Sequence, residues 1–283
     1  MKYFIFSVFI SSTFLGFSQF EPNLNVFWNN YTFQNPAMTG LINKQEASVN
    51  FQENFSFKSA PTTLLATYAT QIDKVGGLGV NYIYNQYGFM TRNQANLNYS
   101  YHFKFSDTAQ VLALGVGLGI VNVASKLYDF IESPVPLNNS TQNQTGFSLN
   151  FGMAYVNRNF TAGLGMTQVN EVKLDRIYFQ QKRHFNVFVD YTFQVAKNFK
   201  LKPTVSFVTD SDFHNLEFNL LAIVKNTFWV GGSYKSRNDV SVMVGYDIKQ
   251  KLRIGYAHGF QFSQLNNGID AGNHELVLGF IIK

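Results

Sequence analysis

Apolar and polar side chains alternate strictly along much of this chain. Between Gln94 and Lys104 every second residue is apolar, namely Ala95, Leu97, Tyr99, Tyr101 and Phe103. Successive side chains of a β-strand point to opposite faces, so this stretch predicts a strand with one apolar wall and one polar wall. The same period recurs in residues 185–193 and 240–248. A helix would spread these residues around its circumference, and the pattern therefore favours strands.

About fourteen segments carry this pattern, an even strand count that suits a bacterial single-chain barrel. They cover residues 46–57, 61–72, 76–86, 91–105, 109–124, 144–157, 159–169, 182–196, 198–209, 214–225, 226–236, 238–248, 251–262 and 273–283. A closed sheet of that size has a polar lumen and an apolar outer belt, which suits only lipid. We therefore predict an all-β fold, a transmembrane antiparallel β-barrel with a short N-terminal lead-in segment. A soluble β-sandwich or a large soluble barrel is the alternative.

The lengths of the connections support a barrel. Bacterial barrels keep both chain ends in the periplasm, with short periplasmic turns and longer outer loops. Every second connection here is tight: residues 73–75, 106–108 and 249–250, and the turns around Arg158, Lys197 and Asn226. Most of the others are long: residues 125–143, 170–181, 210–213 and 263–272. The outer connections near Pro61 and Arg237 are predicted to be short.

On one predicted strand, the face opposite the apolar residues carries almost no side chains. In Leu112 to Ile120 the apolar residues alternate with Ala113, Gly115, Gly117 and Gly119. A strand without side chains on one face allows another part of the chain to approach closely. We expect the lead-in segment or a loop to fold against this face inside the barrel.

The N-terminus predicts export. Lys2 precedes an apolar and hydroxyl-rich run from Tyr3 to Leu15, and Gly16-Phe17-Ser18 offers small residues for cleavage, so residues 1–18 are predicted to be a secretory signal peptide. The alternative is a membrane-anchoring helix, but the run falls short of the roughly 20 residues that a spanning helix needs. Residues 19–45 then form the lead-in segment and residues 46–283 the outer-membrane barrel.

The composition agrees with this class. Aromatic residues make up 17% of the chain and charged residues 14%, whereas soluble domains carry about 25% charge. The mean hydropathy is only −0.08, because lipid-facing and lumen-facing residues of a barrel average out. The absence of cysteine excludes disulfides and thiolate sites. The net charge of +5 is spread along the chain without a dense basic run, so we expect no nucleic-acid partner.

Little in the sequence indicates catalysis. The five histidines, His102, His184, His214, His258 and His274, lie on separate predicted strands without metal-ligand spacing. Asp210-Ser211-Asp212 with His214 is the most chemistry-like cluster and could serve a metal or a hydrolytic dyad. We interpret it as a solvated outer loop with turn-forming residues. We therefore expect no enzyme activity, no catalytic residue, no cofactor and no metal.

Six motifs follow one another along the chain: Phe27-Trp28-Asn29-Asn30-Tyr31, Asn35-Pro36-Ala37-Met38-Thr39-Gly40, Ala60-Pro61-Thr62-Thr63, Gly77-Leu78-Gly79, Asn98-Tyr99-Ser100-Tyr101-His102 and Gly272-Asn273-His274-Glu275-Leu276. Together and in this order they resemble the PorP/SprF family of Bacteroidota outer-membrane proteins. The resemblance implies an outer-membrane location and a role with the type IX secretion system and gliding motility. It also implies partners: the C-terminal domain of a secreted cargo protein, other secretion components and the lipid bilayer.

The segment containing Asn35, Pro36, Ala37 and Gly40 is the candidate site, either a partner-binding motif or a structural one. Pro36 fixes its own φ and biases Asn35 to an extended conformation, and Gly40 permits a turn into the first strand. The resemblance implies that the chain anchors or presents an adhesin-type surface protein. The alternative function is a general diffusion porin or small-solute channel.

Overall fold

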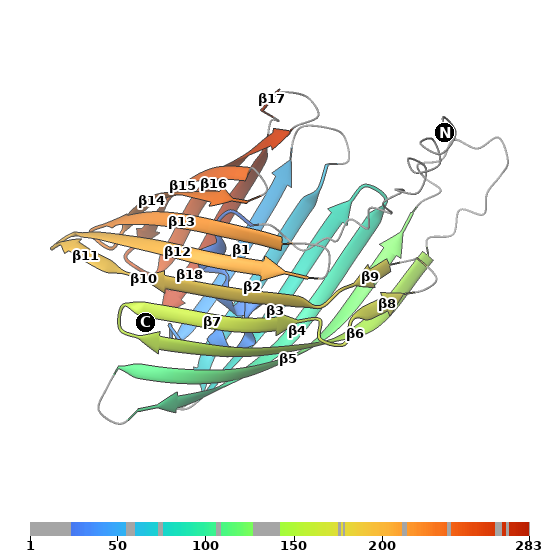
Figure 1. The fold of residues 1–283 in the computed structure, drawn as a ribbon, viewed down its shortest axis with the longest axis horizontal. Coiled ribbons are helices and arrows are strands. Elements are labelled where there is room, and N and C mark those ends of the chain that lie inside the picture. The colour runs from blue at the N-terminus through green and yellow to red at the C-terminus, as the bar shows by residue number, and fades with distance from the viewer. Residues whose placement is uncertain are drawn as a thin grey trace, which may run out of the picture.

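The alternating segments form the strands of one closed antiparallel sheet (Figure 1). The computed structural model describes residues 24–54, 60–72, 76–105, 109–126, 142–174, 177, 179–210, 214–236, 239–263, 268–269 and 272–282. The predicted signal peptide, residues 1–18, lies outside this part of the chain. Among the described residues, no helix is both long and apolar enough to cross a membrane.

Three short helical turns precede the strands: η1 (Phe27–Asn29), α1 (Tyr31–Gln34) and η2 (Pro36–Met38). The strands are β1 (Gln45–Asn54), β2 (Thr62–Ile72), β3 (Gly76–Tyr87), β4 (Met90–Lys104), β5 (Gln110–Ser125), β6 (Gln142–Asn157), β7 (Phe160–Thr167), β8 (Val172–Leu174), β9 (Phe179–Gln181), β10 (His184–Tyr191), β11 (Phe193–Ala196), β12 (Phe199–Thr209), β13 (His214–Val224), β14 (Phe228–Lys235), β15 (Asp239–Ile248), β16 (Leu252–Ser263), β17 (Gly268–Ile269) and β18 (Asn273–Ile282).

The barrel closes through its first and last strands. Each wall strand pairs with its neighbours in sequence, and β1 pairs along its whole length with β18, from Gln45 opposite Ile282 to Asn54 opposite Asn273. β11 continues the line of β10 after Thr192, and both pair with β12. The wall therefore has fourteen strands, which confirms the predicted fold class.

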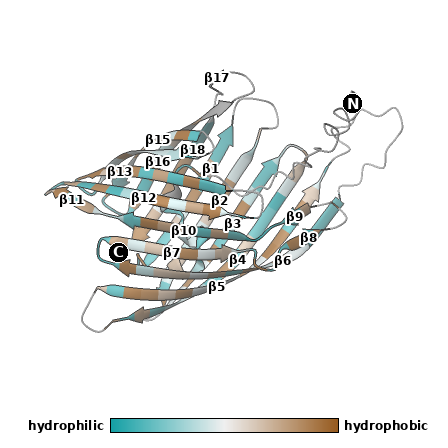
Figure 2. Ribbon diagram, in the orientation of Figure 1, coloured by the Kyte–Doolittle hydropathy of each residue, from teal (hydrophilic) through white to brown (hydrophobic). Residues whose placement is uncertain are grey.

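The outer face of the wall is apolar. On β4, Leu97, Tyr99 and Phe103 are exposed, whereas the opposite row is buried from Arg92 to His102. The same alternation continues around the barrel, as the changing hydropathy along each strand shows (Figure 2). Forty or more large apolar side chains would face water in a soluble protein; on a barrel this belt faces lipid.

The two ends of the barrel differ. At the end where β1 begins, the described connections are tight: Lys225 and Asn226, and likewise Lys249 and Gln250, have positive φ, as the central residues of type I′ turns require. We call this the short-turn end and the opposite one the long-loop end. Of the predicted turns, 73–75 and 106–108 lie outside the described residues. The structure adds a third short connection at the long-loop end, Gly88–Phe89 between β3 and β4.

Three predicted segments differ from the structure. The predicted loop 263–272 contains β17, in which Ile269 pairs with Phe262 of β16. The predicted loop 170–181 contains a small hairpin, in which Val172 of β8 pairs with Gln181 of β9. Three-residue strands are too short for alternation to reveal them. The predicted strand 182–196 is divided at Thr192 into β10 and β11. The remaining strands begin and end within a few residues of their predicted positions.

Candidate functional site

The lead-in segment lies inside the barrel. We call residues 24–44 the plug; it contains η1, α1 and η2 and joins β1 at the short-turn end. Val26, Tyr31, Ala37 and Met38 of the plug are buried against small or apolar side chains of the inner wall. The plug thus fills much of the lumen rather than extending along its rim.

Asn35 attaches the plug to two strands at once. Its side-chain amide donates to the backbone carbonyls of Met153 on β6, at 3.0 Å, and Leu164 on β7, at 3.1 Å. Its Oδ1 accepts a hydrogen bond from the backbone amide of Ala37, which caps η2. Asn35 is extended, with φ −143°, before Pro36. The side chains of Asn35, Pro36 and Ala37 are all buried in the lumen.

The glycines of β5 create the space that the plug occupies. A Cβ added to Gly115 would lie 2.2 Å from the backbone nitrogen of Ala37 and 2.4 Å from the carbonyl carbon of Pro36. Ser100 on the neighbouring strand donates to the Ala37 carbonyl at 2.9 Å. The expectation that the lead-in segment folds against the bare face of this strand is confirmed.

Gly40 turns the plug into the wall. Its φ of +63° is a left-handed conformation that favours glycine. A Cβ at this position would lie 2.7 Å from the Thr70 carbonyl oxygen. One residue earlier, the Thr39 carbonyl contacts His102 Nε2 at 3.3 Å, and Gly77 leaves room for that carbonyl. Both the conformation and the space around Gly40 therefore depend on the missing side chain.

A buried carboxylate holds the other end of the plug. Glu275 on β18 accepts hydrogen bonds from the backbone amides of Asn25, at 2.5 Å, and Val26, at 3.3 Å. Its second oxygen accepts from Asn50 at 2.7 Å. The buried Lys235 ammonium donates to the Leu24 carbonyl at 3.3 Å. Because buried charges are costly unless they are paired and hydrogen-bonded, this cluster fixes where residues 24–26 lie.

A second polar cluster surrounds Tyr31 of α1. The phenol donates to Asp190 at 2.7 Å and accepts from Lys202 at 3.3 Å, and Lys202 also lies 3.2 Å from Asp190. The Tyr31 ring stacks on Phe188 with centroids 4.6 Å apart. Burial, followed by the negative charge of Asp190, raises the pKa of the Tyr31 phenol well above 10.0. The phenol therefore keeps its proton and remains a donor.

A third cluster holds η1. Arg253 on β16 makes a two-point contact with Asp247, at 2.8 and 2.7 Å, and donates to Asn29 Oδ1 at 2.9 Å. The guanidinium lies over the Trp28 ring, 4.5 Å from its centroid. Trp28 in turn meets Trp229 edge to face at 5.0 Å. Planar guanidinium groups suit this combination of bidentate pairing and stacking.

The β8–β9 hairpin lies at the long-loop end (Figure 1), and its contacts place it against the inner face of the wall. Val172 and Leu174 pack on Val121 and Val123, which belong to the inward row of β5. Gln181 of β9 donates to Gln94 of β4 at 3.2 Å across the inner wall. Plug and hairpin together fill much of the lumen, and a cavity of about 60 Å³ remains between Phe33 and Gln34 of the plug and wall residues such as His184.

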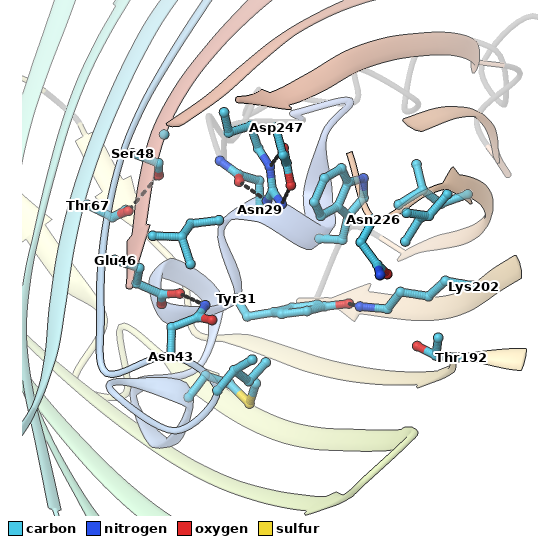
Figure 3. A pocket seen from close by; sticks show the side chains of 18 of the residues that line it. Asn29, Tyr31, Asn43, Glu46, Ser48, Thr67, Thr192, Lys202, Asn226 and Asp247 are labelled. Carbon is cyan, nitrogen blue, oxygen red and sulfur yellow. Dashed lines mark hydrogen bonds and ion pairs between the residues drawn. The ribbon is translucent and has the colours of Figure 1, made fainter. Parts of the chain in front are cut away.

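The short-turn end keeps an open vestibule. This cavity of about 280 Å³ is lined by plug residues and by the inner wall (Figure 3). Trp28, Tyr31 and Ile42 of the plug border it on one side, and Lys200 and Lys202 of β12 on the other. Its lining combines aromatic surface with the cations Lys200, Lys202 and Arg253 and the carboxylates Glu46 and Asp247.

The predicted cluster around Asp210 is arranged differently. Asp210 is buried, and its carboxylate lies 3.2 Å from Nε2 of His184. The interpretation of Asp210 as a solvated turn residue is therefore wrong, while residues 211–213 lie outside the described residues. His214 contacts the Thr209 hydroxyl at 2.5 Å. Within the described part of the chain, no group of three potential metal ligands comes together.

The apolar outer belt, the even number of strands and the occupied polar lumen define the class: this is an outer-membrane β-barrel. The chain belongs to the PorP/SprF family, described as type IX secretion system membrane protein PorP/SprF, which matches residues 16–280. The resemblance seen in the sequence motifs is confirmed. Membership associates the chain with the type IX secretion system and its components.

Solved structures with a similar fold are outer-membrane transporters. The Ralstonia pickettii toluene transporter TbuX is 10% identical over 89% of this chain and 93% of its own, with a TM-score of 0.55. A Pseudomonas aeruginosa FadL homologue is 12% identical over 88% and 93%, with a TM-score of 0.53. At such low identity the likeness concerns the fold alone. No curated protein matches the chain.

Outside the Asn35 to Gly40 motif, Glu275 belongs to the motif at residues 272–276, whereas Lys235, Arg253, Asp190 and Lys202 were not singled out as anchors from the sequence. Glu275, Lys235, Arg253, Asp190 and Lys202 all belong to inward rows of wall strands. In a chain with only 14% charged residues, a charge on the polar row of a strand is the available signal. The position of a charge in a strand does not reveal which residue it contacts, because partners such as Asn25 and Glu275 are 250 positions apart.

Proposed function

We propose that this barrel anchors or presents a secreted surface protein at the outer face of the membrane. Family membership supports a role in type IX secretion. The observation that carries the finer proposal is the occupied lumen: Glu275, Asn35 and the glycines of β5 hold the plug where a solute would have to pass. A barrel with an occupied lumen binds its partners at its two rims. The long, weakly charged connections lie at the rim predicted to face outward.

In this proposal the segment Asn35, Pro36, Ala37 and Gly40 is structural. Its residues are buried in the lumen, and its polar groups are used in contacts with the wall. The cargo contacts belong instead to the long connections, such as residues 125–143. The barrel has no catalytic step of its own, and residues 1–18 serve only as a cleaved signal peptide.

The general diffusion porin is the competing function. It requires a continuous water path through the lumen, whereas the vestibule ends at Trp28, Tyr31 and Met38 of the plug. On the far side of the plug, the β8–β9 hairpin packs on Val121 and Val123. The arrangement therefore favours the anchor over the porin.

The test compares cells that carry the tagged wild-type barrel with cells in which residues 127–141 are replaced by a short Gly-Ser turn. We expect purification in mild detergent to recover a secreted protein, bound through its C-terminal domain, with the wild type. The shortened variant should lose this protein to the medium. The matched control is Asn159→Ser with Asn198→Ser in turns of the opposite rim, which should retain it. Recovery of the wild-type barrel alone, with unchanged surface loading in the variant, would overturn the proposal.

A further inference from the structure

A ring of exposed cations surrounds the short-turn end of the barrel. We call it the basic ring; it consists of Lys44, Lys104, Arg158, Lys197, Lys225, Lys249 and Lys251. The antiparallel circuit of strands brings these residues, from widely separated parts of the chain, to one rim. Of the described residues in the turns of this rim, none is acidic, and none of the ring cations has an ion-pair partner among the described residues. The turns outside the described residues contain Asp73, Lys74 and Asp107.

The long-loop end lacks such a bias. Its described charged residues include Glu53, Lys126, Lys173 and Asp239, and Glu171 there pairs with Arg183 at 3.9 Å. The charge of the molecule is therefore polarised along the barrel axis. Like charges on one rim repel each other, and a rim on which cations outnumber acids favours a partner of opposite charge.

The vestibule opens at the centre of the basic ring. Lys200 lines it and has no partner within the described part of the chain, whereas Lys202 and Arg253 are paired with Asp190 and Asp247. Two buried donors on the plug side of the vestibule, Trp28 Nε1 and Asn29 Nδ2, also have no partner among the described residues. Buried donors are normally satisfied, so their presence indicates a place for acceptor atoms.

We propose that this rim docks an acidic segment of a periplasmic protein, with carboxylates on the basic ring and the end of the segment in the vestibule. The class of partner follows from charge and position: the ring is cationic, and the short turns of outer-membrane barrels face the periplasm. A lipid headgroup could neutralise the outside of the ring, but the vestibule lies inward of the wall, away from the bilayer. The proposal is independent of the cargo-anchoring function, which concerns the opposite rim.

The chain contains its own fluorescence probe for this site. It has two tryptophans, Trp28 and Trp229, which touch each other, and Trp28 lines the vestibule. The experiment titrates the full barrel, in nanodiscs of zwitterionic phospholipid, with a short glutamate-serine peptide that bears a quencher at its C-terminus. We expect saturable quenching that weakens as salt screens the charges. The same peptide with glutamine in place of glutamate should quench little.

Two matched double variants locate the site. Lys197→Glu with Lys251→Glu reverses two ring charges and should weaken peptide binding about tenfold, because exposed pairs contribute up to about 1 kcal/mol each. Lys126→Glu with Lys173→Glu reverses two exposed charges at the far end and should change binding less than about twofold. Lys200→Glu should weaken quenching by itself. Equal quenching by both peptides, or equal effects of the two double variants, would overturn the proposal. Retention of anionic phospholipid by the basic ring, without any quenching by the peptide, would also overturn the proposal.

Discussion

At the scale of single residues, a few buried polar groups hold the plug in the lumen. Glu275 accepts two consecutive backbone amides of the plug, and Asn35 donates to the backbones of two wall strands. Hydrogen bonds to a charged acceptor contribute about 1.5–3 kcal/mol each, roughly twice as much as neutral ones. The position of the plug therefore depends more on these groups than on its short helical turns, which contain three or four residues each.

The substitution Glu275→Gln tests this dependence by replacing one carboxylate oxygen with an amide NH₂ group. The amide keeps the shape but loses the charge, so we expect the plug to become less stably ordered by about 2 kcal/mol. Hydrogen exchange at the backbone amides of Asn25 and Val26 should accelerate accordingly. Glu53→Gln on the outward row of the adjacent strand is the matched control and should leave exchange unchanged. Equal protection in both variants would show that Glu275 does not hold the plug.

Gly115→Ala tests the space reserved by β5. The added methyl would lie 2.2 Å from Ala37, so the plug must shift, at a cost of about 1–3 kcal/mol or more. Gly232→Ala is the control, because its nearest neighbour would be the Ser241 carbonyl oxygen at 3.2 Å. Limited proteolysis should cut the plug faster in Gly115→Ala than in the wild type or the control. Identical cleavage in all three would contradict the close approach.

The raised pKa of Tyr31 gives the plug a pH dependence. A phenol whose folded pKa exceeds the unfolded value near 10 stabilises the plug fully below that value and loses the effect as pH rises through the folded pKa. We expect the emission of Trp28 to shift toward that of an exposed tryptophan only in strongly alkaline solution. Tyr31→Phe should abolish this transition. A shift that occurs in neutral solution in both proteins would rule out the phenol as its cause.

At the scale of elements, alternation predicted the wall because each strand has a lipid row and a lumen row. Strand ends were less certain, since turn residues such as Lys225 and Lys249 carry no period of their own. The β8–β9 hairpin was missed because three residues cannot display a period, and its stability comes from packing on Val121 and Val123. The bare row of β5 did predict that something packs there, but the residues in contact depend on the folded chain.

The lipid row makes a depth-dependent prediction on β4. Leu97 is 55% exposed near the middle of the strand, whereas Phe105 follows its end. Leu97→Lys should destabilise the folded barrel in a bilayer by about 2–4 kcal/mol, and Phe105→Lys by at most about 1 kcal/mol. Denaturant titration of the two variants in lipid vesicles measures the difference. Equal effects would mean that the exposed row does not span the bilayer.

At the scale of the whole molecule, the barrel has an occupied middle and two dissimilar ends. Sequence patterns predicted the closed wall and the family, since both depend on local period and on ordered motifs. They could not predict how the lumen is filled, because pairs such as Tyr31 with Asp190 join residues 159 positions apart. The polarity between the basic rim and the long-loop rim likewise emerges only when the circuit of strands is closed.

Ion conductance across a planar bilayer tests the occupied lumen most directly. The intact barrel should insert without steady conductance, and a variant lacking residues 24–40, once its folding is verified by its heat-dependent gel mobility, should conduct. Gly115→Ala should show intermittent openings as the plug moves. A steady conductance of the intact barrel, equal to that of the deletion variant, would contradict the account.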